Sequence, residues 1–357
     1  MRNIPEDSKI VVAMSGGVDS GTAAYLLVEA GYEVVGVFMQ HLDNMDEQRE
    51  SAQATAKKLD IPLEVVDYRV EFRKVVVNYF ISEYKLGRTP NPCVVCNKWI
   101  KFGKLLEHSK KRGCQYLATG HYARIKSSLE GKQGSNRFNL LMARDKSKDQ
   151  SYFLWQLDQN QFEQVLFPIG DRKKEGIVKI AREKHLPVAK RPESFEVCFV
   201  GGSLRSFLER YIPSKIEPGP VKDTHGEIIG KHYGLPFYTY GQRRGYDLTK
   251  YQGIPLYVIE KDYESNALIV GRGAESEVNE FKLEDVNWII PPEGNKLNCM
   301  IRIRHQGQLI PGTIVIQSRF KPKVVLDYGE RGVAPGQSAV FYNGEAVLGG
   351  GVISLRS

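Results

Sequence analysis

Hydrophobic and polar positions alternate between strand-like and helix-like patterns over the first third of the chain. Short apolar runs predict buried strands over residues 9–12, 33–39, 62–67 and 115–119. Amphipathic segments predict helices over residues 21–30, 47–59 and 71–85. This order predicts an α/β domain with a doubly wound parallel sheet. Because such sheets bind ligands at the carboxyl ends of their strands, we expect the loop after residue 12, Met39 and Gly120 to share one rim.

The rest of the chain carries mainly strand signals. Residues 122–126 and 138–144 predict a hairpin around the polar loop 127–136. Residues 213–253 are rich in Pro and Gly and predict a small mixed β domain, placed as a clamp. A C-terminal β-barrel is predicted from strands over residues 300–305, 313–317, 323–327, 339–342 and 347–354. We expect the three domains to cover residues 1–205, 206–272 and 273–357.

Composition indicates a globular protein with a weakly basic balance. The 357 residues include 50 Lys and Arg against 42 Asp and Glu, and the formal net charge of +8 favours an acidic partner such as nucleic acid. Five cysteines, an odd and sparse set, argue against a disulfide framework and for a reducing compartment. No apolar run has the length of a signal peptide or a membrane span, so we expect a cytoplasmic protein with no membrane partner.

A glycine-rich turn, Ser-Gly-Gly-Val-Asp-Ser at residues 15–20, joins the first predicted strand to the first helix. A strand, a tight turn and a helix N-terminus present converging backbone N–H groups, which suit a phosphate. No Lys-Ser or Lys-Thr follows the second glycine, so the turn is not a P-loop, and it is not a GxGxxG motif. It resembles the SGGxDS signature of the PP-loop ATP pyrophosphatases, which split ATP into AMP and pyrophosphate to adenylate an oxygen.

Two cysteines three positions apart are candidates for chemistry. Two prolines keep the stretch from Thr89 extended and block a helix until Asn97, which places Cys96 at a helix N-terminus beside Lys98 and Lys101. That setting lowers the pKa of a thiol, so Cys96 is a candidate nucleophile. Cys93 and Cys96 could instead be a redox pair, half a zinc site or part of a cluster site. A zinc site with four cysteines needs a second pair, which the chain lacks.

The other three cysteines are typical of packed interiors. Cys198 lies between apolar residues in a short strand predicted over residues 197–200. Cys114 lies at a helix-to-strand junction, and Cys299 lies on the apolar face of a strand. Considered singly, these positions favour structural roles.

Six motifs occur in the order found in one enzyme family. They are SGGVDS, NPxxxCNKxIKFG, ATGHYAR, KDQSYFL, CFVG and GQRRG, and they cover nearly the whole chain. On these motifs the chain resembles the tRNA-specific 2-thiouridylases, which place sulfur on the wobble uridine of tRNA. The resemblance implies the use of ATP and Mg²⁺ and a tRNA substrate, with the Glu, Gln and Lys isoacceptors expected. It also implies a cysteine desulfurase or a sulfur-relay protein as the sulfur donor.

The resemblance further implies three groups of site residues. ATP is expected to bind at Ala13, Met14, Ser15, Gly16, Gly17, Val18, Asp19, Ser20, Met39 and Gly120. In catalysis, Cys96 is expected to be the nucleophile, Cys198 to carry a persulfide and Asp19 to position Mg²⁺ or phosphates, with a Cys96–Cys198 disulfide in the resting or turnover state. Contacts with tRNA or its target base are expected at Asn91, Pro92, Cys93, His121, Lys148, Asp149, Gln150, Arg304, His305 and Gln337.

Two local expectations concern structure near the RNA. Asp149 is predicted to cap the start of a helix that carries Phe153 and Leu157. In the barrel, Arg302 and Arg304 alternate with apolar residues, so the basic side of this strand is expected to face RNA.

The chain departs from the family pattern at Cys93, where many members carry Asp. A thiol does not replace a carboxylate, so the acid/base role often assigned to that Asp does not carry over. Cys93, Cys96 and Cys198 could instead hold a [4Fe–4S] cluster with one iron open for sulfide, which resembles the cluster-dependent tRNA thiolases. The persulfide and the cluster use the same residues, and both stay open here.

The expected reaction has two halves. O2 of a flipped uridine attacks the α-phosphorus of ATP, and sulfur from the persulfide or the open iron then replaces the adenylated oxygen. Two other functions are kept as alternatives. A PP-loop ligase acting on a small molecule would need neither a basic barrel nor paired cysteines. A non-catalytic tRNA-binding protein would not need the intact turn at residues 15–20.

Overall fold

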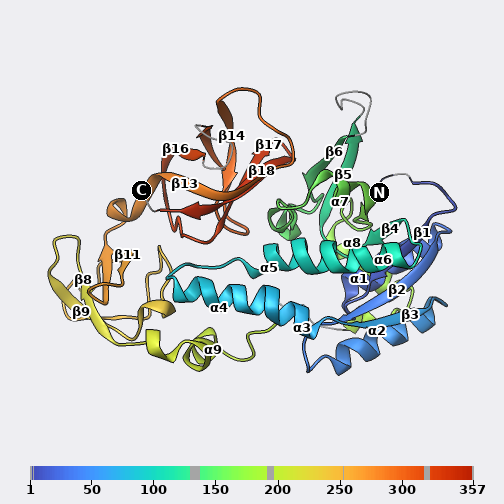
Figure 1. Cartoon of the computed structure of the whole chain (residues 1–357), viewed down its shortest axis with the longest axis horizontal. Coiled ribbons are helices and arrows are strands. Elements are labelled where there is room, and N and C mark those ends of the chain that lie inside the picture. The colour runs from blue at the N-terminus through green and yellow to red at the C-terminus, as the bar shows by residue number, and fades with distance from the viewer. Residues whose placement is uncertain are drawn as a thin grey trace.

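The computed structural model describes Arg2 and residues 4–128, 137–190, 197–251, 253–316 and 322–355. Figure 1 shows an α/β domain at the right, a barrel at the top centre and a small β domain at the left. Helix α4 (Asn78–Lys85) and the helix that begins at α5 (Pro92–Val95) cross the middle of the view between these parts.

A five-stranded parallel sheet forms the core of the α/β domain, in the order β3-β2-β1-β4-β7. The strands are β1 (Lys9–Ala13), β2 (Glu33–Gln40), β3 (Leu63–Asp67), β4 (Tyr116–Ala118) and β7 (Val165–Leu166). The four predicted strands are confirmed to within one residue at each end. The sequence pattern missed β7 because two residues are too few to show a period.

Helices pack on both faces of this sheet. Val11 and Leu117 face an apolar cluster with Phe102, whereas Ile10 faces a second cluster with Leu27. The remaining helices of the domain are α1 (Val18–Glu29), α2 (Asp46–Lys58), α3 (Arg69–Phe72), α6 (Leu106–Lys111), α7 (Gln159–Gln164) and α8 (Lys174–Glu183). The chain order of the strands reverses between β1 and β4, and sheets of this kind bind ligands at that point.

The helix with the first two candidate cysteines begins earlier than predicted. It starts at Pro92 in α5 and continues through the π-helical segment Cys96–Leu105 into α6. A proline at the first helical position lacks only an N–H that has no partner inside a helix, so it starts the helix instead of blocking it. Cys93 and Cys96 therefore lie one turn apart on this helix, which we call the cysteine helix.

An aromatic cluster lies between the α/β domain and the small β domain. A second π-helical segment, Arg73–Val77, joins α3 to α4, and α9 (Leu204–Tyr211) packs on this long helix. The ring of Phe80 on α4 meets the ring of Phe199 at 5.1 Å between centroids and that of Phe207 at 5.6 Å. This packing holds the chain next to Cys198 against α4.

The small β domain contains a mixed five-stranded sheet in the order β10-β9-β8-β12-β11. Its strands are β8 (Gly219–Lys222), β9 (Ile228–His232), β10 (Asp247–Leu248), β11 (Tyr257–Asp262) and β12 (Ala267–Gly271). Strands β12 and β8 are parallel, and the other neighbours are antiparallel. The prediction of a small mixed β domain is confirmed.

The C-terminal part is a closed antiparallel barrel of six strands. They are β13 (Glu277–Trp288), β14 (Lys296–Arg302), β15 (Ile310–Val315), β16 (Lys323–Arg331), β17 (Ser338–Asn343) and β18 (Ala346–Ser354), and β13 pairs with β18 to close the barrel. The predicted hairpin is confirmed as β5 (Ala123–Ser128) and β6 (Arg137–Met142), with residues 129–136 of its loop outside the described part. Strand β18 pairs with β6, so the hairpin extends the barrel sheet.

Two short predicted elements are wrong. Residues 197–200 form a turn and not a strand, because Phe199 packs into the aromatic cluster and not along a sheet edge. The helix predicted after Asp149 is replaced by 3-10 turns at Lys146–Lys148 and Ser151–Phe153. The other 3-10 turns are Pro187–Lys190, Pro213–Lys215, Leu235–Phe237 and Ala274–Ser276.

Candidate active site

A cavity of ≈ 410 Å³ opens at the carboxyl ends of β1, β2 and β4. Among the residues predicted as sites, its lining includes Ala13, Met14, Ser15, Asp19, Ser20, Met39, Pro92, Cys93, Cys96, Gly120, His121, Gln150 and Cys198. The predicted shared rim is therefore confirmed. Residues of the glycine-rich turn 15–20 and three cysteines therefore line the same cavity.

The turn at residues 15–20, which we call the PP-loop, is held by its own hydrogen bonds. Ser15 N donates to Ser20 Oγ over 3.1 Å, and Ser20 Oγ donates to Gly17 O over 3.1 Å. Gly16 has φ of 75°, and a Cβ there would lie 2.2 Å from Gln48 O. A Cβ on Gly120 would lie 2.7 Å from Ser20 N. Glycine at these two positions lets the backbones meet and leaves the start of α1 facing the cavity.

Asp19 is held by two side chains, those of Lys174 and Tyr122, that no sequence motif indicates as site residues. Lys174 Nζ, at the start of α8, lies 2.8 and 2.9 Å from the two carboxylate oxygens of Asp19. Tyr122 Oη donates to Asp19 Oδ1 over 2.8 Å. The partners lie more than 100 positions away along the chain, so a local motif could not show them.

The thiols on the cysteine side do not have the predicted low pKa. Burial raises the pKa of Cys96 to about 12 and that of Cys198 to about 11, and it also raises the pKa of Cys93. The prediction assumed that Cys96 lies at an exposed helix N-terminus, but it lies one turn into the helix and is only 9% exposed. Desolvation therefore outweighs the nearby lysine. All five cysteines are free thiols, so the Cys96–Cys198 disulfide stays a prediction for turnover.

Lys101 is the only Lys or Arg among the described residues that line the cavity. Its charge lowers the pKa of Cys93, Cys96 and Cys198, against the larger effect of burial. Lys101 Nζ lies 3.4 Å from His121 Nε2, and Thr119 Oγ1 lies 2.7 Å from His121 Nδ1. Burial lowers the pKa of His121 well below its usual value, so the imidazole is neutral and accepts from Lys101.

The predicted tRNA contacts fall into separate places. Asn91 is buried just before the cysteine helix, and Lys148 ends the 3-10 turn next to Asp149. Arg304 and Gln337 line a second groove of ≈ 770 Å³ between the barrel, the small β domain and Thr89. The ring of His305 lies tilted against that of Phe153, 4.4 Å apart between centroids, and Phe153 belongs to the 3-10 turn that follows Gln150. Each of these assignments to tRNA stays a prediction.

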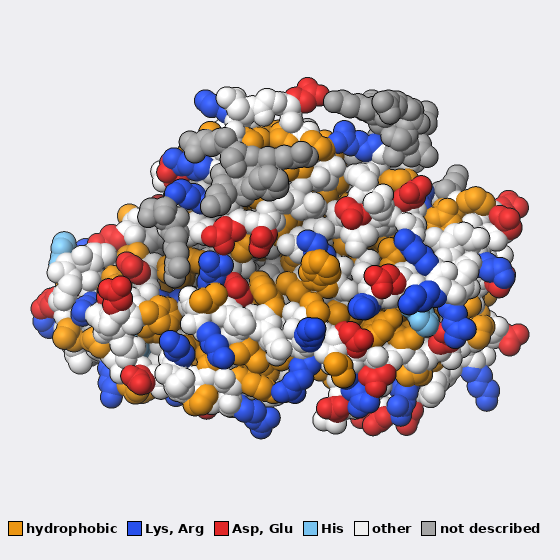
Figure 2. Space-filling model, viewed as in Figure 1, with side chains coloured by type: hydrophobic (Ala, Val, Ile, Leu, Met, Phe, Trp, Pro, Cys, Tyr) orange, Lys and Arg blue, Asp and Glu red, His pale blue; other side chains and the backbone are white. Residues whose placement is uncertain are grey.

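Two expectations about charged side chains change with the structure. Asp149 does not begin a helix, and its carboxylate pairs with Arg302 over 3.0 Å, with side-chain exposures of 2% and 13%. Arg302 therefore points into the interface between the barrel and the α/β domain, whereas Arg304 stays 48% exposed. On the face in Figure 2, Lys and Arg side chains are interspersed with Asp and Glu. The net charge of +8 is thus not gathered into one patch on that face.

The donors in the cavity suit Mg²⁺ with a nucleotide better than a metal bound by protein alone. Within the described ranges, no three His, Cys, Asp or Glu side chains gather as ligands for a metal ion. Asp19 supplies one carboxylate in the PP-loop, and Mg²⁺ commonly takes one or two carboxylates with substrate phosphates.

Fold and cavity together define a class, proteins with an α/β domain whose PP-loop faces a group of thiols. Residues 8–202 match the family model described as tRNA methyl transferase HUP domain. Residues 205–272 match the tRNA methyl transferase PRC-barrel domain, and residues 278–353 match the Aminomethyltransferase beta-barrel domain.

Relatives narrow this class to one family. The chain is 44% identical over 361 residues to the tRNA-specific 2-thiouridylase MnmA of Chloroflexus aurantiacus, which spans 97% of this chain and 98% of that protein. It is 38% identical over 367 residues to the tRNA-specific 2-thiouridylase MnmA of Bacillus subtilis, over 99% and 96% of the two chains. The chain belongs to this family, the tRNA-specific 2-thiouridylases, which are tRNA sulfurtransferases. None of the helices in the described residues is both long and apolar enough to cross a membrane.

Proposed function

We propose that this protein uses ATP to activate O2 of the wobble uridine in tRNA and replaces that oxygen with sulfur carried as a persulfide on Cys198. The products are 2-thiouridine, AMP and pyrophosphate. The observation that carries the proposal is that the PP-loop and three thiols line one cavity of ≈ 410 Å³. An adenylated base can then be formed and consumed without leaving the protein, which protects it from water.

In the first half-reaction, uridine O2 forms a bond to the α-phosphorus of ATP while the bond to pyrophosphate breaks. The N-terminus of α1 and the backbone of the PP-loop suit the negative charge of the phosphates. Asp19 would hold Mg²⁺, which neutralises phosphate charge when bound. Lys174, which pairs with Asp19, adds a positive charge next to the same position.

In the second half-reaction, the terminal sulfur of the Cys198 persulfide bonds to C2, and AMP leaves with the electron pair of the C2–O bond. The Cys96 thiolate then attacks Cys198 Sγ, and the S–S bond of the persulfide breaks. Its electron pair passes to the sulfur on C2, which becomes the thiocarbonyl of 2-thiouridine. The Cys96–Cys198 disulfide that remains is reduced by an external thiol before the next turnover. The charge of Lys101 lowers the pKa of Cys96 and Cys198, against the larger effect of burial, and so favours the thiolates that these steps need.

The alternative sulfur source is a [4Fe–4S] cluster on Cys93, Cys96 and Cys198. The three thiols line one cavity, but in the described residues they are not gathered as metal ligands. We therefore derive no step through a cluster.

The partners follow from the family. We propose the Glu, Gln and Lys isoacceptors of tRNA as substrates and a cysteine desulfurase or a sulfur-relay protein as the source of the persulfide. Residues 1–205 would carry both half-reactions, residues 206–272 would clamp the tRNA, and residues 273–357 would support the RNA. We also propose a cytoplasmic location, because five free thiols persist in a reducing compartment.

Replacing Cys93 tests the persulfide route against the cluster. Cys93→Asp introduces the residue that many family members carry, so under the persulfide route the variant keeps most of its tRNA thiolation. A carboxylate is a poor ligand for a soft iron–sulfur centre, so under the cluster route the variant loses iron and thiolation together. Cys93→Ser is the control, since it removes the thiol without adding the carboxylate.

The measurement is thiolated tRNA per enzyme, together with the colour and iron content of anaerobically and aerobically purified protein. We expect thiolation by Cys93→Asp without iron in either preparation. Thiolation that follows iron content across the variants would overturn the persulfide route. If ATP is not converted to AMP in the presence of tRNA by the wild-type protein, the whole proposal fails.

A further inference from the structure

Residues 149–155 contact the barrel on one side. On the other side they contact both halves of the active-site cavity, the nucleotide half with the PP-loop and the cysteine half with the cysteine helix. We propose that the ion pair between Arg302 of the barrel and Asp149 positions this segment, so that the barrel fixes the PP-loop relative to the cysteine helix. Arg302 and Asp149 are then positioning residues for the reaction and not contacts with tRNA. This inference rests on the function proposed above for the cavity.

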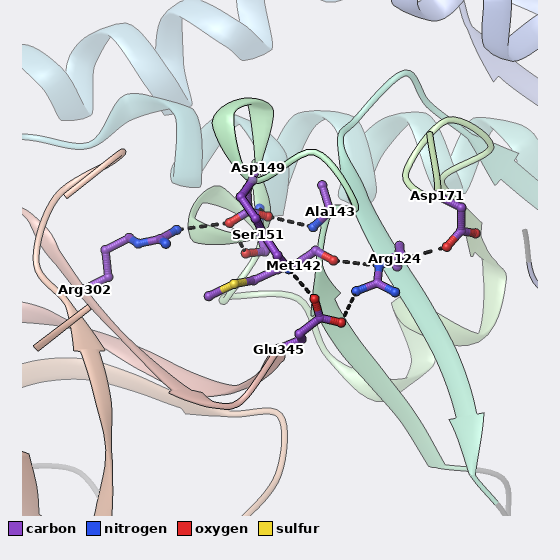
Figure 3. Close-up of polar contacts among 9 residues, drawn as sticks. Arg124, Met142, Ala143, Asp149, Ser151, Asp171, Arg302 and Glu345 are labelled. Atoms are coloured by element: carbon purple, nitrogen blue, oxygen red, sulfur yellow. Dashed lines mark hydrogen bonds and ion pairs between the residues drawn. The ribbon is translucent and has the colours of Figure 1, made fainter. Parts of the chain in front are cut away.

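The Asp149 carboxylate is surrounded by donors, and one of them comes from the barrel (Figure 3). Arg302 Nη1 donates to Oδ2 over 3.0 Å, and Ser151 Oγ donates to the same oxygen over 2.9 Å. Ala143 N donates to Oδ1 over 2.9 Å. The Arg302 guanidinium also lies over the ring of Tyr342, 5.1 Å from its centroid. Both charges are paired inside the protein, which leaves them poorly placed to meet a phosphate.

The next residue connects this ion pair to the nucleotide side. Gln150 N donates to Tyr122 O over 2.8 Å, and Gln150 Oε1 accepts from Tyr122 N over 2.9 Å. Tyr122 Oη in turn donates to Asp19 Oδ1 over 2.8 Å. Arg302 is therefore connected to the PP-loop by hydrogen bonds to Asp149, between Gln150 and Tyr122, and from Tyr122 to Asp19, with Asp149 and Gln150 joined by the chain itself.

The far end of the segment connects to the cysteine side. Asn97, which follows Cys96, donates from Nδ2 to Phe153 O over 3.0 Å. The barrel also holds the approach to the cysteine helix, because Gln337 Nε2 donates to Thr89 O and Pro90 O, each over 3.1 Å. Both halves of the cavity are thus connected by hydrogen bonds to the closed barrel.

Uncharged contacts keep the segment attached when the ion pair is removed. Tyr152 Oη donates to Ser338 O over 2.9 Å, and Trp155 Nε1 donates to Ser338 Oγ over 3.0 Å. Both rings are fully buried. Loss of the ion pair should therefore shift Gln150 and Phe153 without releasing the barrel.

The test compares Arg302→Gln, Asp149→Asn and the double variant with the wild-type full chain. We expect AMP formation at saturating ATP and tRNA to fall by about tenfold in each single variant, because a displacement of about 1 Å can cost on the order of 100-fold. The Kd for tRNA should change by less than about twofold, since no phosphate contact is lost. The double variant should be no slower than the slower single variant, because the two residues act as one unit.

Glu345→Gln is the matched control. Glu345 pairs with Arg124 and Lys146 across the same interface but does not contact Asp149 (Figure 3). It should leave AMP formation near the wild-type rate while losing charge pairs across the same interface that are more exposed than the Arg302–Asp149 pair. Arg302→Lys keeps the buried positive charge and should recover part of the rate, and it replaces Arg302→Gln if the latter fails to fold.

Two results would overturn the inference. A tenfold weaker Kd for tRNA in Arg302→Gln, with AMP formation at saturation unchanged, would make Arg302 a tRNA contact. An equal loss of rate in Glu345→Gln would show that the Arg302–Asp149 pair only stabilises the interface and does not position the cavity. Failure of the proposed function is distinguishable from both, because it appears as absent AMP formation in the wild-type enzyme.

Discussion

The two halves of the cavity are built in opposite ways. On the nucleotide side, polar groups are already paired, with Tyr122 and Lys174 holding the Asp19 carboxylate. On the cysteine side, Cys96 packs in an apolar cluster with Phe80, and burial raises its pKa to about 12. One half is arranged for charge before any substrate arrives, whereas the other favours neutral groups.

Because of this difference, we expect the sulfur transfer to be harder than the adenylation. Adenylation develops charge where donors are already in place, which costs little reorganisation. Sulfur transfer needs a thiolate in surroundings that disfavour one, and among the described lining residues Lys101 alone supplies a Lys or Arg charge there. We therefore expect sulfur transfer to be the half-reaction that responds to pH.

Removing the Asp19 carboxylate should break the nucleotide half alone. We expect Asp19→Ala to lower pyrophosphate release by about 100- to 1,000-fold, because the variant loses the group that positions Mg²⁺ or phosphates. Affinity for tRNA should stay within about twofold, since Asp19 makes no expected contact with RNA. Pyrophosphate release and filter binding of tRNA measure the two quantities.

Asp19→Asn serves as the control, because it keeps the shape and one acceptor oxygen for Tyr122. Alkylation of Cys96 should proceed at the wild-type rate in both variants. Lost affinity for tRNA with retained pyrophosphate release would show that Asp19 is assigned to the wrong half.

The same contrast explains what the sequence could predict. The PP-loop is predictable because residues 15–20 are a local motif between a strand and a helix. Four of the five strands of the sheet follow from apolar runs, whereas their order does not. The partners of Asp19 and Asp149 come from distant positions, which no local pattern contains. The pKa of Cys96 was predicted with the wrong sign, because its burial depends on packing by Phe199 and α9.

The reactivity of the thiols with pH sharpens the comparison on the cysteine side. Because the pKa of Cys96 is raised to about 12, the thiol stays protonated near neutral pH. Between pH 7 and 9 its alkylation rate should rise about tenfold per pH unit, as the thiolate fraction does. Cys198, which is exposed and has a pKa raised to about 11, should react faster than the buried Cys96 at each pH. Mass spectrometry after timed iodoacetamide treatment resolves each site, and a plateau near pH 7 would contradict the prediction.

Replacing Lys101 by Met should make the cysteine side of the cavity still less favourable for thiolates. Without the ammonium, the pKa of Cys96 and Cys198 rises further, so less thiolate is present at a given pH. We expect alkylation at pH 8 to slow by about threefold to tenfold, since a nearby charge shifts a pKa by up to about one unit at this exposure. Lys98→Met is the matched control on the same helix, because Lys98 lies over the Trp99 ring and does not line the cavity. An equal effect of both variants would show that Lys101 does not lower the pKa of the thiols more than another lysine of the same helix does.

An RNA contact outside the cavity should affect both halves equally, and Arg304 offers the smallest and most discriminating change. Arg304 lines the groove of ≈ 770 Å³ and keeps a 48% exposed side chain, although it pairs with Glu330. If it also meets a phosphate, Arg304→Gln should weaken tRNA binding by about threefold to tenfold and reduce the slope of log K against log salt by about 0.7 to 0.9. AMP formation and thiolation, measured at saturating tRNA, should both return to wild-type rates. A defect in one half-reaction that persists at saturating tRNA would show that Arg304, like Arg302, positions the cavity and does not contact the RNA.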